Sequence, residues 1–238
     1  MNLVLFEPAE ARVPLPSRDP RALHLLTVLR RRVGDTFDAG LVNGPRGKGT
    51  IVAIDPHALT LRFDWGPEPP PLDPITLIVG LPRPQTARDI LRDATTLGAA
   101  ALHFVATEKG DPNYAASTLW RRDQWRRHLI AGAEQAFSTR LPLVTHGLAL
   151  AEAIVGLPAG DTRIALDNYE AAEPLSTCHT LYDKAVCLAL GGERGWSPAE
   201  RALLRANGFA FAHLGERVLR TETAVIAALT LMKARLGL

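Results

Sequence analysis

The stretch Leu214-Gly-Glu-Arg-Val-Leu-Arg-Thr-Glu-Thr-Ala224 decides the fold of this 238-residue chain. It leaves a predicted strand at 209–214, passes through a glycine and enters a predicted helix at 221–236. A plain surface loop would favour polar turn formers throughout. Val218 and Leu219 instead lie between two arginines, which predicts an apolar wall with a guanidinium beside it. A packed loop whose arginines cap carbonyl groups is the alternative that the spacing leaves open.

A second unusual strand end, Leu190-Gly-Gly-Glu-Arg-Gly195, lies earlier in the chain. Its three glycines would let a ligand approach the backbone closely and reach exposed amide groups. The next helix begins at Ser197-Pro198, with Glu200 completing a capping box, and its dipole adds positive potential nearby. A flexible turn is the alternative. Ligands of parallel α/β sheets bind beyond the carboxyl ends of strands, so both stretches are candidate sites.

The chain around these stretches alternates predicted strands and helices, which favours a largely parallel sheet covered by helices. The predicted strands are 75–81, 100–106, 162–166, 185–190 and 209–214, and the predicted helices are 87–97, 117–138, 198–207 and 221–236.

The first part of the chain is rich in predicted strands. Five prolines between Gly66 and Pro74 make an extended boundary, which predicts a small domain over 1–70 and an α/β domain over 75–238. A helix is predicted from Asp19-Pro20 to about residue 30, and turn formers fill 43–48. A small twisted barrel with one helix is expected from the predicted strands at 2–6, 36–42, 49–54 and 59–63.

Composition excludes several classes of protein. With 47% hydrophobic and 22% charged residues, the chain has the apolar mass for a core, and its net charge of +2 makes it no polycation. No apolar run reaches the length of a membrane span, and the N-terminus does not resemble a signal peptide. Cys178 and Cys187 are expected to be buried, reduced thiols, and the histidine spacing predicts no metal site. A cytoplasmic location is therefore expected.

The stretch 214–224 resembles the closing signature of the 16S ribosomal RNA uridine-N3 methyltransferases, a family of the SPOUT methyltransferase class. Other motifs of that family agree in order along almost the whole chain. They are His24 with Val28-Leu29-Arg30 and Gly34, then Leu97-Gly98, and then Ala133-Glu134-Gln135 with Arg140 and Pro142.

The resemblance implies a PUA-like β-barrel over 1–70, followed by a SPOUT α/β domain over 75–238 that carries a C-terminal trefoil knot. It implies a homodimer that uses S-adenosylmethionine, needs no metal and acts on 16S ribosomal RNA or the small ribosomal subunit. True knots are nearly absent from protein folds. Composition and spacing give no sign of one in this chain.

The chain departs from the family pattern at several positions. Where the family has Gly-Pro-Glu-Gly-Gly, this chain has 191–195 with Arg194 in place of a glycine. Thr96 and Asp93 replace a family glutamate and lysine, and the segment 81–86 lacks the usual Gly-Glu-Lys character. Glu193, Gly195, Leu214, Gly215, Arg217, Leu219 and Arg220 are retained.

The resemblance also implies which residues form the site. Methyl transfer to uracil N3 releases a proton and spreads negative charge over O2 and O4, which fixed cations stabilise. Arg220 suits that role because its planar fork stays charged. Glu193 is the candidate proton acceptor or its orienter, and Glu222 is the alternative. The predicted cofactor-binding residues are Leu166, Leu190, Gly191, Gly192, Gly195, Leu214, Gly215, Val218, Leu219 and Arg220.

RNA binding is expected to use local arginine clusters, because 23 of the 27 basic residues are arginine. Solvated helix faces are the alternative for Arg126 and Arg127, and a dipole-favoured helix end for 30–32. The candidates are Arg30, Arg31, Arg32, Arg46, Lys48 and Arg62, with Arg121, Arg122, Arg126 and Arg140 extending the surface.

Three rival functions stay open at this point. The first keeps the fold but changes the target to another ribosomal or transfer RNA nucleotide. The second is an RNA-binding protein that has lost catalysis, which Arg194 suggests because it stands in place of a family glycine. The third, a nicotinamide-dependent oxidoreductase, lacks the G-x-G-x-x-G turn after its first strand.

Overall fold

A computed structural model describes residues 3–178 and 185–238 and divides the chain into two compact units. The first unit is Met1–Pro71 with Ala133–Leu141, and the second is Leu72–Gly132 with Pro142–Leu238. The sequence analysis did not predict that residues 133–141 belong to the first unit, because it placed a single boundary, at the proline-rich stretch.

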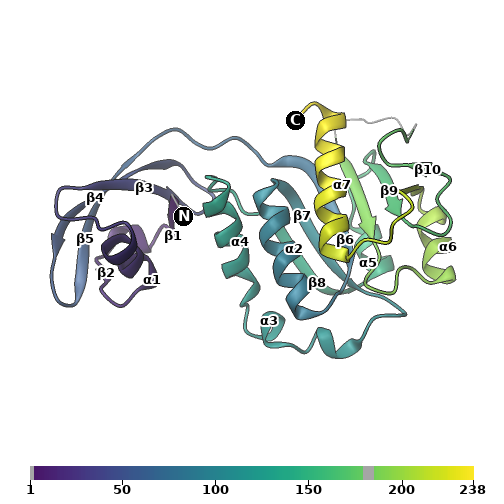
Figure 1. Cartoon of the computed structure of the whole chain (residues 1–238), viewed down its shortest axis with the longest axis horizontal. Coiled ribbons are helices and arrows are strands. Elements are labelled where there is room, and N and C mark those ends of the chain that lie inside the picture. Colours follow the sequence, from purple (N-terminus) through teal and green to yellow (C-terminus); the bar gives the residue numbers. More distant parts are fainter. Residues whose placement is uncertain (1–2, 179–184) are drawn as a thin grey trace. The chain divides into compact units, whose positions relative to one another are not determined.

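The first unit is a curled five-stranded sheet in the order β1-β3-β4-β5-β2 (Figure 1). Only β1 and β3 pair in parallel. Phe6, Phe37 and Leu59 are among the side chains that fill its core. The strands are β1 (Leu3–Phe6), β2 (Leu15–Pro16), β3 (Thr36–Leu41), β4 (Arg46–Ile54) and β5 (Ala58–Trp65), so β4 starts three residues before the predicted strand.

The predicted helix of the first unit is present, although only its first part is an α-helix. Asp19 caps α1 (Pro20–Leu23) by accepting the Arg21 N–H at 2.8 Å, and the chain then widens into the π-helical turn η2 (His24–Val28). The Arg21 guanidinium also pairs with Asp19 and Glu10, and its hydrogen bonds lower the pKa of both carboxyl groups. The helical segment ends at Arg30, which has a left-handed backbone (φ 52°).

The second unit is built on a parallel sheet in the order β10-β12-β9-β11-β6-β7-β8. The central strand β11 is fully buried, as the apolar sequence of a strand covered on both faces predicts. The strands are β6 (Asp73–Gly80), β7 (Ala99–Ala106), β8 (Leu143–Ala149), β9 (Thr162–Leu166), β10 (Glu173–Pro174), β11 (Val186–Leu190) and β12 (Ala210–His213).

Helices cover both faces of this sheet (Figure 1). On one face, α2 (Pro84–Thr96) and α7 (Thr221–Leu236) lie side by side. Lys233 of α7 pairs with Asp73 and donates to the Leu97 carbonyl oxygen at 2.9 Å, which joins the two helices to the start of β6. On the other face, α5 (Leu150–Val155) and α6 (Pro198–Ala206) contribute to one apolar cluster with Trp196.

The prediction of one helix over 117–138 was wrong. The structure has two helices there, α3 (Thr118–Arg121) and α4 (Trp125–Gln135), preceded by the short turn η3 (Pro112–Tyr114). Asp123 lies between them with φ 49°, a backbone conformation that a helix cannot contain, and its carboxylate accepts the Trp125 indole N–H at 3.2 Å. The sequence analysis also missed β8 and α5, because the uncharged run 141–151 passes from the whole of β8 into the start of α5 without a break.

Candidate functional site

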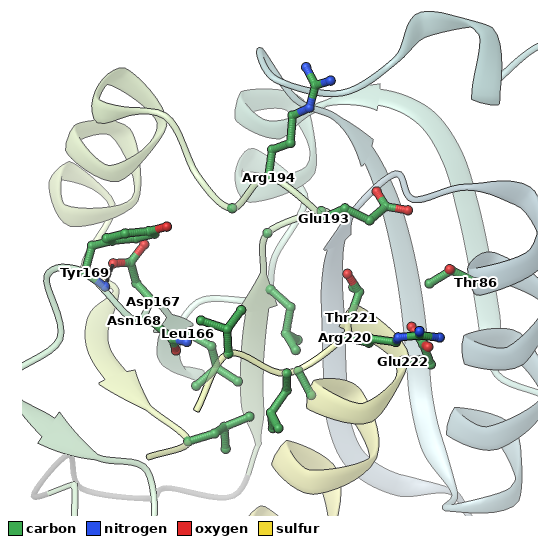
Figure 2. Close-up of a pocket in the computed structure, with 18 of the residues that line it drawn as sticks. Thr86, Leu166, Asp167, Asn168, Tyr169, Glu193, Arg194, Arg220, Thr221 and Glu222 are labelled. Carbon is green, nitrogen blue, oxygen red and sulfur yellow. Dashed lines mark hydrogen bonds between the residues drawn. The ribbon is translucent and has the colours of Figure 1, made fainter. Parts of the chain in front are cut away.

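A cavity of about 590 Å³ lies at the carboxyl ends of the parallel strands in the second unit (Figure 2). This volume falls within the range of about 300–1,000 Å³ that is typical of small-molecule sites. Four chain segments meet there, and they follow β6, β9, β11 and β12. The lining residues are Arg83, Thr86, 166–169, 190–195, Leu214, 218–222 and Ala224.

Backbone contact between glycines forms the centre of the site. A Cβ atom at Gly80, the last residue of β6, would lie 2.5 Å from the Gly192 nitrogen. A Cβ atom at Gly191 would lie 2.8 Å from the Gly195 Cα. Gly195 itself has φ +62°, which disfavours a side chain there as well. The 191–195 turn therefore packs on the end of β6 because residues 80 and 191 carry no side chain, and its glycines present backbone to the cavity.

Glu193 fixes this turn to the start of α2. Its Oε1 accepts the Arg83 N–H at 2.9 Å, so the carboxylate caps a helix whose first residues offer no side-chain cap. Arg194 replaces a glycine without occupying the cavity, because its exposed side chain points away from the other lining residues in Figure 2. Lys109 donates to the Arg194 and Trp196 carbonyl oxygens at 3.4 and 2.8 Å, which supports the turn from its other side.

One wall of the cavity depends on a buried ion pair. Asp167 directly follows β9 and is 5% exposed. Its Oδ1 accepts the N–H groups of Tyr169 and Glu170 at 2.8 Å each, and its Oδ2 accepts from Arg201 Nε at 2.8 Å. The Arg201 guanidinium also lies 5.3 Å from the centroid of the Tyr169 ring. The pair thus holds the 167–170 turn against α6.

The stretch 214–224 forms the wall opposite the 167–170 turn. Gly215 has φ +103° and donates its N–H to His213 Nδ1 at 3.0 Å, which turns the chain out of β12. Leu219 is half-buried, whereas Val218 is 83% exposed at the rim. Arg220 is the N-cap residue of α7, with an exposed side chain that lies beside Glu222 and across from Thr86 in Figure 2. Val218, Leu219 and Arg220 line the cavity together, but Val218 belongs to its exposed rim and not to a buried apolar wall.

The structure brings the predicted cofactor-binding and catalytic residues together. Every one of them lines this cavity except Gly215, which shapes the turn behind it. A second cavity of about 450 Å³ shares Arg83 and residues 192–195 with the first and is otherwise lined by Leu81, Thr107, Lys109, Gly110, Asp111 and Tyr114.

The predicted RNA-binding residues fall into two groups. Arg46 and Arg140 donate to backbone carbonyl oxygens of the first unit at 2.7 to 3.2 Å, and Lys48 forms an ion pair with Asp38 at 2.7 Å. These three cations thus also stabilise the fold of that unit. The others are exposed: Arg30, Arg31, Arg32, Arg62, Arg121, Arg122 and Arg126.

Within residues 3–178 and 185–238, no three His, Cys, Asp or Glu side chains gather as metal ligands do, and no helix is long and apolar enough to cross a membrane. His179 and Lys184 lie outside the described residues. Cys178 and Cys187 are buried thiols, and burial raises the pKa of Cys187 to about 12. Neither cysteine lines the cavity.

Comparisons with known proteins agree with this geometry. Residues 68–233 match the family model of an RNA methyltransferase domain. The ribosomal RNA small subunit methyltransferase E of Treponema pallidum is 36% identical over 98% of this chain and 91% of its own length. The Borreliella burgdorferi enzyme of that name, numbered 1, is 26% identical over 99% of both chains. This chain belongs to the ribosomal RNA small subunit methyltransferase E family.

Solved structures share the fold of this family member. One from Neisseria gonorrhoeae, a ribosomal RNA small subunit methyltransferase E bound to S-adenosyl methionine, has a TM-score of 0.80 at 24% identity and covers 99% of this chain and 98% of its own. A probable rRNA-methyltransferase from Porphyromonas gingivalis has a TM-score of 0.81 at 20% identity over 97% of both chains. Membership of the family confirms the resemblance that the 214–224 stretch predicted.

Sequence reasoning missed part of the cavity of this methyltransferase. Asp167, Asn168 and Tyr169 line it but were not predicted. A usable signal existed, because polar residues directly follow the predicted strand 162–166 and should lie at the same sheet edge as 190–195. Arg83 and Thr86 were missed for a different reason, since the 81–86 segment departs from the family pattern.

The buried Asp167–Arg201 pair yields a prediction about stability. Asp167→Asn keeps the acceptor for the Tyr169 and Glu170 N–H groups but removes the nearer and more deeply buried carboxylate partner of Arg201, which is left with Glu170 Oε1 at 3.8 Å. We expect it to lower the free energy of unfolding by about 3 kcal/mol, as measured by urea denaturation. Arg201→Met should have a similar effect, and the double variant should lose clearly less than the sum of the two. Additive losses would show that the two groups do not stabilise each other.

Proposed function

We propose that this protein transfers a methyl group from S-adenosylmethionine to N3 of a uridine in 16S ribosomal RNA. The observation that carries the proposal is the glycine-lined cavity at the strand ends, with the Arg220 side chain at its edge. The names of the relatives support a substrate in the RNA of the small ribosomal subunit.

The residues present fit S-adenosylmethionine. The missing side chains at Gly191, Gly192 and Gly195 leave peptide groups on the cavity lining that can bond to a nucleoside or an amino-acid group. Such a site needs apolar walls as well, because most of a bound ligand of this size is buried against them. Leu166, Leu190, Leu214 and Leu219 supply those walls. When bound, the cofactor supplies a methyl group on a positively charged sulfur.

The residues of the chain supply charge and orientation for the reaction. Uracil N3 carries a proton that must leave before or during attack, and the resulting negative charge spreads over O2 and O4. Arg220, exposed at the cavity edge, stabilises that charge with two parallel N–H groups. Glu193, held in place through the Arg83 N–H, accepts the proton or orients the group that does. Glu222, in the first turn of α7, is the alternative acceptor.

The finer features of the architecture belong to the same proposal. The first unit would be a PUA-like barrel that contacts RNA, and the second a SPOUT domain that carries a C-terminal trefoil knot. The likeness in fold to a solved structure over 99% of this chain supports this architecture. A homodimer is supported by α7, which carries apolar residues on every side and exposes Ile226. A ribosomal substrate implies work in the cytoplasm.

Arg220 yields a prediction about turnover. Arg220→Ala removes the cation that faces the developing charge but leaves the cavity walls intact. We expect kcat for methyl transfer to fall by about 100-fold or more, as the loss of one stabilising donor does elsewhere. S-adenosylmethionine should still bind with unchanged stoichiometry in a calorimetric titration. The matched control is Arg217→Ala, which removes an exposed arginine of the same stretch that does not line the cavity. Equal turnover in both variants would remove Arg220 from the mechanism.

The target is tested by a map of modified nucleosides. Mass spectrometry of 16S ribosomal RNA from a strain without this gene should show the loss of one N3-methyluridine, and the gene should restore it. Loss of a different modified nucleoside would assign the enzyme to another target. A protein that binds RNA but leaves every nucleoside unchanged would be a homologue without catalysis.

A further inference from the structure

Phe137 has an unusual backbone for its residue type. It follows α4 with φ 56°, in the left-handed region that bulky L-residues avoid. The Ser138 N–H bonds to the Ala133 carbonyl oxygen at 2.9 Å, and the Phe137 N–H bonds to that of Glu134 at 3.3 Å. This pair of hydrogen bonds defines a Schellman motif, in which the left-handed position is usually glycine. The chain places a phenylalanine there.

Burial does not account for this choice. Phe137 is 38% exposed, so its ring does not fill the core. Glycine would end the helix equally well and without the steric conflict between Cβ and carbonyl oxygen. A strained residue persists where the surrounding structure fixes it, and such residues concentrate at functional sites.

Neighbouring residues of the first unit hold Phe137 in place. Arg46 Nη1 donates to its carbonyl oxygen at 2.7 Å, and the guanidinium carbon lies 5.2 Å from the ring centroid. Thr139 donates to the Gly44 carbonyl oxygen at 2.6 Å, and its own carbonyl oxygen accepts the Asn43 N–H at 2.8 Å. The ring and the guanidinium are thus stacked on a fixed backbone, and both side chains are exposed to solvent.

We propose that the Phe137 ring and the Arg46 guanidinium form a stacking site for an unpaired RNA base. Single-stranded bases stack on aromatic rings and on guanidinium planes, and the two occur here in contact. The cation adds attraction to the phosphates that accompany each base of an RNA strand. The inference rests on the proposed RNA substrate, and it assigns recognition to a side chain outside the cavity that holds the cofactor.

The test compares variants of Phe137 in the full chain. Fluorescence anisotropy with a labelled oligouridine of about ten nucleotides measures RNA affinity without methyl transfer. We expect Phe137→Gly to weaken binding by about fivefold or more, which is the smallest effect of losing one stacked base. Its melting temperature should stay equal or rise, because glycine suits the left-handed backbone. Phe137→Trp should bind at least as tightly as the wild type.

Two further variants separate stacking from shape and charge. Phe137→Leu keeps an apolar side chain on the same backbone and should lose affinity as the glycine variant does. Arg31→Gln removes an exposed charge of the same unit and should reduce the dependence of affinity on salt, whereas Phe137→Gly should leave that dependence unchanged.

Wild-type affinity in Phe137→Leu, or a lower melting temperature with unchanged affinity in Phe137→Gly, would overturn the inference. So would a change of oligomeric state without a change of affinity, since the ring would then pack on another subunit. A wild type that binds no oligouridine also refutes it. A wild type that binds oligouridine but methylates no ribosomal RNA refutes the proposed function alone.

Discussion

The contact between two backbones, Gly80 at the end of β6 and Gly192 in the turn after β11, is the constraint on which the site depends. A Cβ atom at Gly80 would come within 2.5 Å of the Gly192 nitrogen, so a side chain at Gly80 would force the two backbone segments apart. Because the turn lies this close, Glu193 reaches the Arg83 N–H and joins the turn to α2. The cavity exists between this turn, the Asp167 turn and the 214–224 stretch because each is fixed to a different strand end.

The two units contribute differently to function. The second unit builds a cavity from peptide groups and leucines, with charged side chains on its lining that include Glu193 in the glycine turn and Arg220 at the helix start. The first unit has a small core and ties several of its basic residues into its own fold, as Arg46 and Arg140 show. RNA recognition by a chain of net charge +2 would thus depend on a few placed side chains rather than on a broad basic field.

Much of the second unit could be predicted from its sequence. Continuous apolar runs identified β6 and β11, and Ser197 with Pro198 and Glu200 marked the start of α6, because these signals are local. The break at Asp123 and the return of 133–141 to the first unit could not be predicted, since both depend on tertiary contacts. The glycine turn could be recognised as a site, but its packing on Gly80 could not, because that partner lies far away in sequence.

The central claim is that the contact between Gly80 and Gly192 shapes a binding site for S-adenosylmethionine. Calorimetric titration of the wild type and of Gly80→Ala tests it most directly, with Gly156→Ala as control because a Cβ there meets no atom closer than 3.6 Å. The account predicts one cofactor bound per chain in the wild type and the control. It predicts no measurable binding in Gly80→Ala, with the circular dichroism of a folded protein. Equal affinity in all three proteins would contradict it.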